Sequence, residues 1–476
     1  MDIVPILPIL DFVQKELLLF ASLCFLIGSL DDIVFDGMWL FYRLKRRLLV
    51  YSVHKRATVE SLDPLTTGCR LAIFVPAWQE APVIGAMLRR CLQQWGSSSY
   101  RIYVGCYPND GDTIAAVAAA SSGSAKVRLV VCRNNGPTTK ADCLNHLWEA
   151  LCQDEVEENS KYAAVVLHDA EDVVHPQSLR LLGHLTGRAT LIQLPVIPRR
   201  AKKSRWIAGH YCDEFAELHG KQMVMREALG ASIPSAGVGC AFDRDALQYL
   251  SVRTRGKPFD AESITEDYEL GLQLTGGPGR GIFARLRDQH GELVATQEFF
   301  PDKLEDAVRQ KSRWMAGIAL SGWDRLGWHD SWQENWMRLR DRKASVAAIV
   351  LAIAYVAVIL TGILLLAEIF DVYRLQPVSQ FLAILLIVNA GFLTWRLLLK
   401  GYFVFSLYGF REALLSIPRT IVANLINILA AWRAIGHYLD QLSGQPANWE
   451  KTRHFYPEAE NIQQLRSNPS LDNRKR

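Results

Sequence analysis

Short apolar runs alternate with helix-like stretches between residues 71 and 167, and this alternation constrains the fold more than any other feature of the chain. We expect helices at 82–94, 113–120 and 140–151, and strands at 71–75, 101–104, 127–131 and 163–167. Such a β-α-β-α order is typical of a mostly parallel sheet that is covered by helices. The sequence therefore predicts an α/β domain.

Polar residues follow the expected strands at their carboxyl ends. In chain order, one strand after another, they include Glu80, Asp110, Lys140 and Asp169. Open sheets of this type bind ligands at the carboxyl ends of their strands. We therefore expect a single ligand site at this edge of the sheet, formed by segments that are far apart in the sequence.

Three carboxylates, those of Asp169, Glu171 and Asp172, directly follow an apolar strand. Carboxylate oxygens are ligands that Mg²⁺ and Mn²⁺ prefer, and such an ion can bridge the protein to a nucleotide diphosphate. Lys140 begins a helix after Thr139, and the positive end of a helix favours an anion such as a diphosphate. Read alone, these segments are also consistent with an acidic helix cap and a solvated lysine.

Two further motifs lie downstream. Glu266 and Asp267 form an acidic pair, and an inverting displacement needs one carboxylate aimed at the acceptor hydroxyl. Gln310, Arg313 and Trp314 are spaced i, i+3 and i+4, which places them on one face of a helix. The arginine can pair with diphosphate oxygens, and the tryptophan can stack on a sugar. Without context, the two motifs are an acidic helix start and an ordinary amphipathic helix.

In this order, the motifs resemble the catalytic signature of membrane-bound family 2 glycosyltransferases, which combines a D-x-D-type pair, T-E-D and Q-x-x-R-W. The resemblance implies a GT-A fold with a Rossmann-like sheet. It also implies a site for Mg²⁺ or Mn²⁺ at Asp169 and Glu171, with Asp172 as a third ligand because glutamate replaces the commoner second aspartate. Three segments further resemble the membrane half of the group of phage N-four adsorption proteins B: 168–172, 235–239 and 309–314.

The same resemblance implies roles for the other motif residues. Asp267 is the expected catalytic base, and Glu266 is the second candidate. The expected donor and nucleotide site comprises Glu80, Asp110, Lys140, Asp169 and Arg313. The expected acceptor site combines two residues of Q-x-x-R-W with two of a glycine-rich segment: Gln310, Trp314, Gly237 and Gly239. Four other residues are expected to pack in the core rather than line the site: Trp78, His210, Glu214 and His219.

Hydrophobic segments flank the α/β region and predict membrane helices. The run 345–369 is apolar and of spanning length, and 381–399 is a further candidate. A third segment, 17–41, contains three aspartates that we expect at an interface or against other helices, because charge is costly in hydrocarbon. The segment 402–438 is ambiguous. Two interfacial helices joined at Pro418 are the favoured interpretation, and a fourth span is the alternative.

Basic residues crowd the flanks of these segments, which predicts that the α/β region and the tail are cytoplasmic. Nine cysteines without a C-x-x-C pair indicate a reducing compartment, and a net charge of +4 is too small to indicate nucleic-acid binding. The expected organisation is an N-terminal transmembrane anchor at 1–48, a cytoplasmic GT-A domain at 60–343, two transmembrane helices at 344–400, interfacial or re-entrant helices at 401–440 and a cytoplasmic polar tail at 441–476.

Together, the motifs and the hydrophobic segments predict an inverting, metal-dependent glycosyltransferase of the bacterial inner membrane. We expect it to move a hexosyl or N-acetylhexosaminyl group from a nucleotide-diphosphate donor, such as a UDP-sugar, to a growing surface glycan or a lipid-linked acceptor. The expected partners are membrane lipid and either an outer-envelope export partner or a second copy of the chain. The alternatives are a catalytically inactive scaffold or phage-receptor component that keeps the fold, and a transporter, which the large polar centre disfavours.

Overall fold

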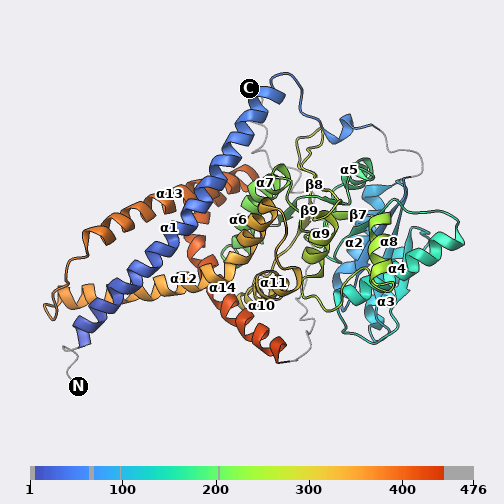
Figure 1. Cartoon of the computed structure of the whole chain (residues 1–476). Helices are drawn as coiled ribbons and strands as arrows, with labels where there is room; N and C mark the ends of the chain where they lie inside the picture. Colours follow the sequence, from blue (N-terminus) through green and yellow to red (C-terminus); the bar gives the residue numbers. More distant parts are fainter. Residues whose placement is uncertain (1–5, 64–68, 97, 202–203, 444–476) are drawn as a thin grey trace.

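The computed structural model describes residues 6–63, 69–96, 98–201 and 204–443, which form two regions of different architecture. Figure 1 shows an α/β domain on one side and long helices that extend from it on the other. The shorter helices are η3 (Val59–Ser61), α2 (Ala81–Trp95), α3 (Gly111–Ser121), α4 (Lys140–Glu157), α5 (Ser178–Leu185), α6 (Ile207–Glu217), η4 (Leu218–Gln222), α7 (Met223–Ala228), α8 (Arg244–Arg253), α9 (Glu266–Thr275), α10 (Leu304–Met315), η5 (Ala316–Ser321) and α11 (Gly322–Leu326).

The main sheet of the α/β domain has seven strands in the order β3-β2-β1-β4-β7-β5-β8. Within it, β7 runs antiparallel to β4 and β5, and the other neighbouring pairs are parallel. This mostly parallel sheet confirms the predicted fold class. Its strands are β1 (Leu71–Pro76), β2 (Tyr100–Cys106), β3 (Val127–Val131), β4 (Ala164–Leu167), β5 (Leu191–Gln193), β7 (Cys240–Asp243) and β8 (Gly281–Phe283), and a second sheet pairs β6 (Val196–Pro198) with β9 (Thr296–Glu298).

Hydrophobic residues of β1 supply both faces of the sheet, because successive side chains of a strand point in opposite directions. Ile73 and Val75 belong to one buried cluster, together with residues of α2, α3 and α5. Ala72 and Phe74 belong to another, together with residues of α4, α8 and α9. The domain therefore has three layers, with helices covering both faces of one sheet (Figure 1).

The strand order brings distant polar residues to one edge of the sheet. β1 lies between β2 and β4, and all three run parallel. The segments that follow them carry Glu80, Asp110 and Asp169. These segments therefore emerge at the same edge, which is where ligands bind in open parallel sheets.

Among the described residues, four helices are long and apolar enough to cross a membrane. They are α1 (Leu7–Lys45), which continues into the π-helical η2 (Arg46–Val50), α12 (Trp332–Ile369), α13 (Gln380–Tyr408) and α14 (Phe410–Leu442). α1 packs against α12 and α13, and the three extend together away from the sheet (Figure 1). At about 1.5 Å per residue, α1 is roughly 58 Å long, about twice the ~30 Å thickness of a bilayer's hydrocarbon core.

The last helical region differs from the expected pair of helices joined at Pro418. α13 continues to Tyr408, and α14 is one helix that contains Pro418. The break lies instead at Gly409, whose φ of +85° suits glycine because glycine has no Cβ. α14 packs along α10 and α6 of the α/β domain, so protein covers one of its faces. The Trp449 segment of the expected tail lies outside the described residues.

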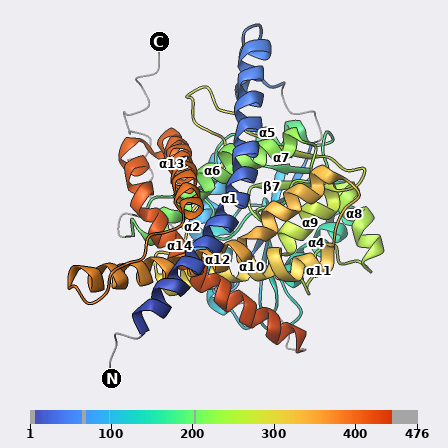
Figure 2. The same ribbon diagram turned by 60° about the vertical axis from the view of Figure 1, so that its left-hand side comes forward.

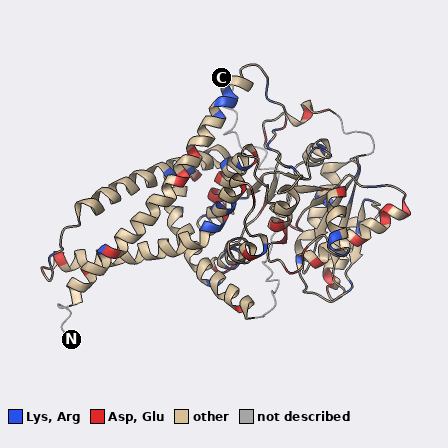
Figure 3. Ribbon diagram, viewed as in Figure 1, with Lys and Arg blue, Asp and Glu red and all other residues tan. Residues whose placement is uncertain are grey.

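The aspartates of α1 lie against basic residues of other elements, in the position expected for them. Asp31 and Asp32 both pair with Arg340 of α12. Asp36, which is 1% exposed, pairs with Lys221 of η4 at 2.5 Å. Figure 3 shows acidic and basic residues gathered where the long helices meet the α/β domain. Opposite charges offset the cost of removing each carboxylate from water, so ion pairs join α1 to α12 and to η4 of the α/β domain.

Candidate active site

A cavity of about 180 Å³ lies at the predicted edge of the sheet. Its walls come from the segments after β1 and β4, from the N-termini of α4 and α9, and from α10. The structure thus brings the three motifs into one site. The lining residues that the sequence predicts are Glu80, Lys140, Asp169, Glu171, Glu266, Asp267, Gln310, Arg313 and Trp314.

Lys140 and Asp169 form an ion pair in the cavity wall, with 2.6 Å between Nζ and Oδ1. Lys140 is the first residue of α4, whose N-cap, Thr139, accepts a hydrogen bond from a backbone N–H of the first turn. Burial opposes the lysine charge, but Asp169, Glu266 and Asp267 outweigh burial and raise the pKa of Lys140. The lysine therefore stays cationic at the positive end of a helix, where an anionic ligand group is favoured.

Asp172 is not among the residues that line the cavity. Its side chain is fully buried, and Oδ2 is hydrogen-bonded to His168 Nδ1 at 2.6 Å. The same oxygen accepts a hydrogen bond from the Asp169 backbone N–H at 3.2 Å. Burial lowers the pKa of His168 to about 4, so the imidazole is neutral near pH 7. The pair fixes the loop that presents Asp169 and Glu171, and metal binding by Asp172 itself stays a prediction.

Asp110 is 7% exposed and does not line the cavity either. One oxygen accepts a hydrogen bond from the Gln79 backbone N–H at 2.5 Å, and the other accepts one from Thr113 at 3.4 Å, where it caps α3. Asp110 thereby ties the β2–α3 turn to the loop that carries Glu80. Its contact with a nucleotide stays a prediction.

Glu266 and Asp267 line the cavity at the first turn of α9. Burial raises the pKa of Glu266 to about 7, and the charge of Asp267 adds to the shift. Burial also raises the pKa of Asp267, whereas the cation of Lys140 lowers it. A carboxylate with a raised pKa accepts a proton more readily than a solvated one, which is the property that a general base needs.

Gly237 leaves room for Asp267. Its φ is +75°, and a Cβ at this position would lie 2.2 Å from Asp267 Oδ2. A side chain at 237 would therefore displace the carboxylate. The neighbouring Ala236 and Val238 line the cavity, whereas Gly237 and Gly239 are not among its lining residues. An acceptor-binding role for the two glycines stays a prediction.

Gln310, Arg313 and Trp314 extend from α10 into the cavity wall, as their spacing predicts. The Trp314 ring packs against Tyr211 and Phe300, with centroids 6.1 and 6.4 Å apart. Gln310 Oε1 is buried and has no hydrogen-bond partner among the described residues. A buried acceptor without a partner is costly, so this oxygen is suited to accept a hydrogen bond from a ligand hydroxyl.

Some lining residues were not placed in the site by the sequence. Trp78, for which core packing is favoured over lining the site, does both, because the ring packs edge-on against Tyr107 and also lines the cavity. Its place just after β1, at the same edge as Glu80, was a signal that could have indicated this. Glu298 and Phe300 also line the cavity. Glu298 is the last residue of β9 and Phe300 follows it, and a strand of only three residues has no readable periodicity. His210, Glu214 and His219 do not line it.

Acidic side chains outnumber basic ones around the cavity. Six carboxylates line it, against the two cations of Lys140 and Arg313. A diphosphate would be repelled by this excess of negative charge unless a positive ion bound with it. Asp169 and Glu171 offer the hard oxygen ligands that Mg²⁺ and Mn²⁺ prefer. The residues present therefore fit a divalent cation.

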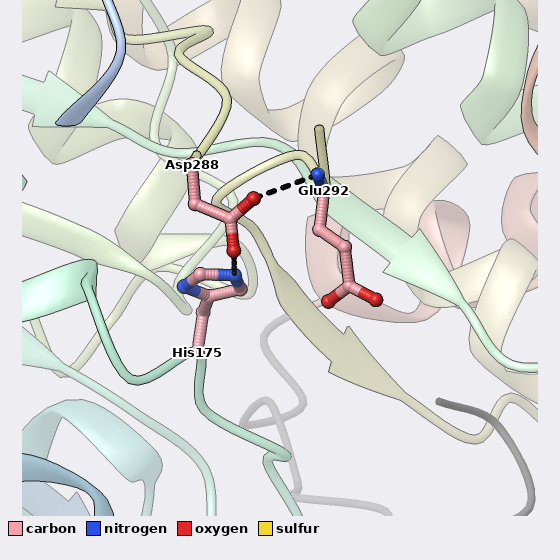
Figure 4. Close-up of side chains that lie close together, drawn as sticks. All are labelled: His175, Asp288 and Glu292. Carbon is pink, nitrogen blue, oxygen red and sulfur yellow. Dashed lines mark hydrogen bonds and ion pairs between the residues drawn. The ribbon is translucent and has the colours of Figure 1, made fainter. Parts of the chain in front are cut away.

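A second group of metal-type ligands lies outside this cavity. Ligand atoms of His175, Asp288 and Glu292 are within 4.8 Å of one another (Figure 4). His175 Nδ1 accepts a hydrogen bond from the Gln177 backbone N–H at 3.1 Å, so the proton of the neutral ring is on Nε2, which lies 3.8 Å from Asp288. A metal at Nε2 would require the opposite tautomer. The geometry suits a link between two loops better than a metal centre.

The mostly parallel sheet, the carboxylate-rich cavity at its edge and the long apolar helices are the features that the motifs predict for membrane-bound family 2 glycosyltransferases with a GT-A fold. The chain belongs to glycosyltransferase-like family 2, whose family model matches residues 69–317, more than half of the sequence. This match confirms the family that the motifs predict.

Two curated relatives and a solved mannosyltransferase structure are among the proteins to which the chain is similar. It is 37% identical over 464 residues to bacteriophage adsorption protein B of Escherichia coli strain K12 and to bacteriophage N4 adsorption protein B of Escherichia coli O157:H7. The alignments cover 93% of this chain but 62% of each relative, so the chain spans less than two thirds of their length. A mannosyltransferase from Pyrobaculum calidifontis, solved with GDP-Man and Mn²⁺, matches 89% of this chain and 99% of its own, with a TM-score of 0.51. At 15% identity, this similarity concerns the fold.

Proposed function

We propose that the chain transfers a sugar from a nucleotide-diphosphate donor to an acceptor hydroxyl, with inversion at the anomeric carbon. The observation that carries this proposal is the meeting of Asp169, Asp267 and Arg313 in one cavity. They supply a metal ligand, a proton acceptor and a cation for the diphosphate. A UDP-sugar with a hexosyl or N-acetylhexosaminyl group is the first donor to test.

The donor side of the proposed site combines acids with two cations. Asp169 and Glu171 would hold Mg²⁺ or Mn²⁺, which neutralises charge on the diphosphate when it is bound. Lys140, at the N-terminus of α4, and Arg313, on α10, are placed to contact the diphosphate oxygens. Because carboxylates predominate in the wall, we expect donor binding to depend strongly on the divalent cation.

In the proposed transfer, the acceptor oxygen attacks the anomeric carbon while its proton passes to the carboxylate of Asp267. A bond forms between the acceptor oxygen and the anomeric carbon, the bond to the diphosphate oxygen breaks, and the nucleoside diphosphate leaves with the electron pair. Attack from the face opposite the leaving group inverts the configuration. Glu266, whose pKa burial raises to about 7, is the second candidate for the base.

Gln310 and Trp314 form the proposed acceptor side. The buried Oε1 of Gln310 can accept a hydrogen bond from a sugar hydroxyl, and an indole ring can stack on the apolar face of a sugar. Their helix, α10, packs along the apolar helix α14. The site therefore adjoins the long helices, which supports a growing surface glycan or a lipid-linked sugar as the acceptor.

We also propose that α1, α12 and α13 cross the bacterial inner membrane, that α14 lies at the interface, and that the α/β domain is in the cytoplasm. Basic residues gather in the last turn of α1 and in the first turns of α12, as the positive-inside rule requires of cytoplasmic flanks. All nine cysteines are free, in keeping with a reducing compartment.

The names of the two relatives favour a second candidate, a catalytically inactive scaffold or a phage-receptor component. A scaffold needs the fold. It does not need a general base, a cationic side chain and carboxylates suited to a metal ion within one cavity. Because Asp169, Asp267 and Arg313 line the same cavity, the site supports the catalytic function rather than the scaffold.

Donor turnover distinguishes the two candidates. The chain purified in detergent should release nucleoside diphosphate from at least one nucleotide sugar of a panel when Mg²⁺ or Mn²⁺ is present, and excess chelator should abolish the release. Full activity in excess chelator would remove the metal from the mechanism. A well-folded protein that turns over no donor, judged by a cooperative thermal transition, would favour the scaffold.

A further inference from the structure

The end of α1 and the residues after it form an apolar and basic surface, and we propose that this surface binds the anionic head groups of a lipid bilayer. We define the juxtamembrane segment as residues 40–56. Its helical part rises away from the α/β domain in Figures 1 and 2, and η2 has no buried residue. The proposal does not depend on the proposed enzymatic activity.

Large apolar side chains of the juxtamembrane segment are exposed. Large apolar side chains exposed close together in the sequence indicate a site for a membrane or a partner, because water disfavours them. An amphipathic helix buries such a face at the boundary between head groups and acyl chains. The side chains, with exposed fractions between 42 and 75%, are Leu40, Phe41, Leu44, Leu48, Leu49 and Val53.

The charge of the segment selects an anionic partner. No acidic residue lies between Asp36 and Glu60. Figure 3 shows basic residues at the far end of α1. Basic clusters next to a membrane helix attract the anionic lipids of a bilayer surface. The basic residues of the segment are Arg43, Lys45, Arg46, Arg47, Lys55 and Arg56.

Aromatic residues indicate that the partner is a bilayer surface rather than another protein. The Arg46 guanidinium lies 5.6 Å from the ring centroid of Tyr42 and 5.2 Å from that of Tyr51, and Arg56 lies 4.5 Å from that of Tyr51. Tryptophan and tyrosine are enriched at the head-group level of membranes. Residues 40–50 of the segment are the last part of a helix, Leu7–Val50, that is apolar and long enough to cross a membrane. One lipid surface therefore accounts for its apolar, basic and aromatic residues together.

Spin labelling of the full chain in nanodiscs tests the proposal. Nitroxides attached at Leu44→Cys and Leu48→Cys should be more accessible to oxygen than to a water-soluble nickel reagent in discs of phosphatidylglycerol and phosphatidylcholine. The control is Val252→Cys on α8, a site that is 74% exposed and should show the reverse order. The unmodified chain, labelled in parallel, corrects for native cysteines. The proposal is overturned if the labels at 44 and 48 are more accessible to the nickel reagent than to oxygen. It is also overturned if dipolar broadening shows that a second copy of the chain contacts the segment.

A charge variant tests the preference for anionic lipid. Replacing Lys45, Arg46 and Arg47 by Gln should lower, several-fold, the phosphatidylglycerol that the purified chain retains from mixed-lipid membranes. The matched control replaces three exposed basic residues of the α/β domain by Gln: Arg133, Arg253 and Lys257. Equal retention in both triple variants overturns the anionic preference, even when the labels at 44 and 48 face lipid.

Discussion

Charges around Asp267 decide the pH at which it can accept a proton. Burial raises its pKa and the Lys140 cation lowers it, and only the carboxylate form can act as a base, so the rate falls as the pH drops through that pKa. Replacing Lys140 by Gln should therefore move the acidic limb of kcat/KM to higher pH by about one unit or more. Arg133→Gln, at an exposed position outside the cavity wall, should leave the limb in place. A shift to lower pH, or none, would contradict this account.

Asp172 allows a test of how the acidic loop is held. Replacing it by Ala removes the acceptor for His168 and for the Asp169 backbone N–H, so the loop should lose its fixed conformation. We expect the Mn²⁺ concentration for half-maximal turnover to rise by about 10-fold, with much of the rate restored at high Mn²⁺. Asp172→Asn keeps an acceptor oxygen and should do less. A rate that no Mn²⁺ concentration restores in either variant would instead make Asp172 a direct ligand.

The sequence could predict which residues lie in the site better than it could predict what each one contacts. Spacing and motif order were sufficient for Lys140, Asp169 and Gln310, which line the cavity. Asp110 and Asp172 have the same side chain as Asp169 and also follow strands, yet both are buried and hold loops. Which carboxylate faces a cavity depends on backbone turns, and these are not visible in the order of residues.

Among the elements, α14 joins the apolar helices to the α/β domain through Arg419. Its side chain is 1% exposed and bonds Asp213 of α6 through two nitrogens, at 2.9 and 2.6 Å. Arg419→Met leaves the Asp213 charge buried without its partner, which should destabilise the chain by about 3–5 kcal/mol. Thermal unfolding in detergent measures the effect.

Two further variants test whether the loss of stability in Arg419→Met comes from the broken pair of Arg419 and Asp213. Arg411→Met, at an exposed position of the same helix, should leave the unfolding midpoint nearly unchanged. The double variant Arg419→Met with Asp213→Asn should be less destabilised than the sum of the single variants, because neither charge is then left alone. Additive losses would mean that the ion pair does not hold α14 in place.

At the level of elements, strong local patterns were predicted and weak ones were not. The first four strands lie within a few residues of their expected bounds, because apolar runs and turn residues mark them. The break before α14 was expected at Pro418 and lies at Gly409. Proline disfavours a helix interior by removing one hydrogen bond, but the buried contacts of Arg419 on the next position stabilise the continuous helix. Such tertiary contacts override local preference.

For the whole molecule, the arrangement of the two regions explains the unusual composition of α1. Asp32 and Asp36 would be costly in an isolated membrane helix, but their partners come from α12, α13 and η4, between 185 and 364 residues away in the chain. The sequence could indicate that these acids need partners, and it could not identify them, because the pairs form only when the long helices pack against the α/β domain.

Replacing Asp267 by Asn shows whether one cavity both binds the donor and activates the acceptor. This change keeps the size of the side chain and removes its capacity to accept a proton. Sugar transfer in the presence of Mg²⁺ or Mn²⁺ should fall by roughly 10²–10⁴-fold, and nucleotide binding should survive because Lys140 and the metal-type acids hold the donor separately. Glu266→Gln should reduce transfer less. An unchanged transfer rate in Asp267→Asn would contradict the account.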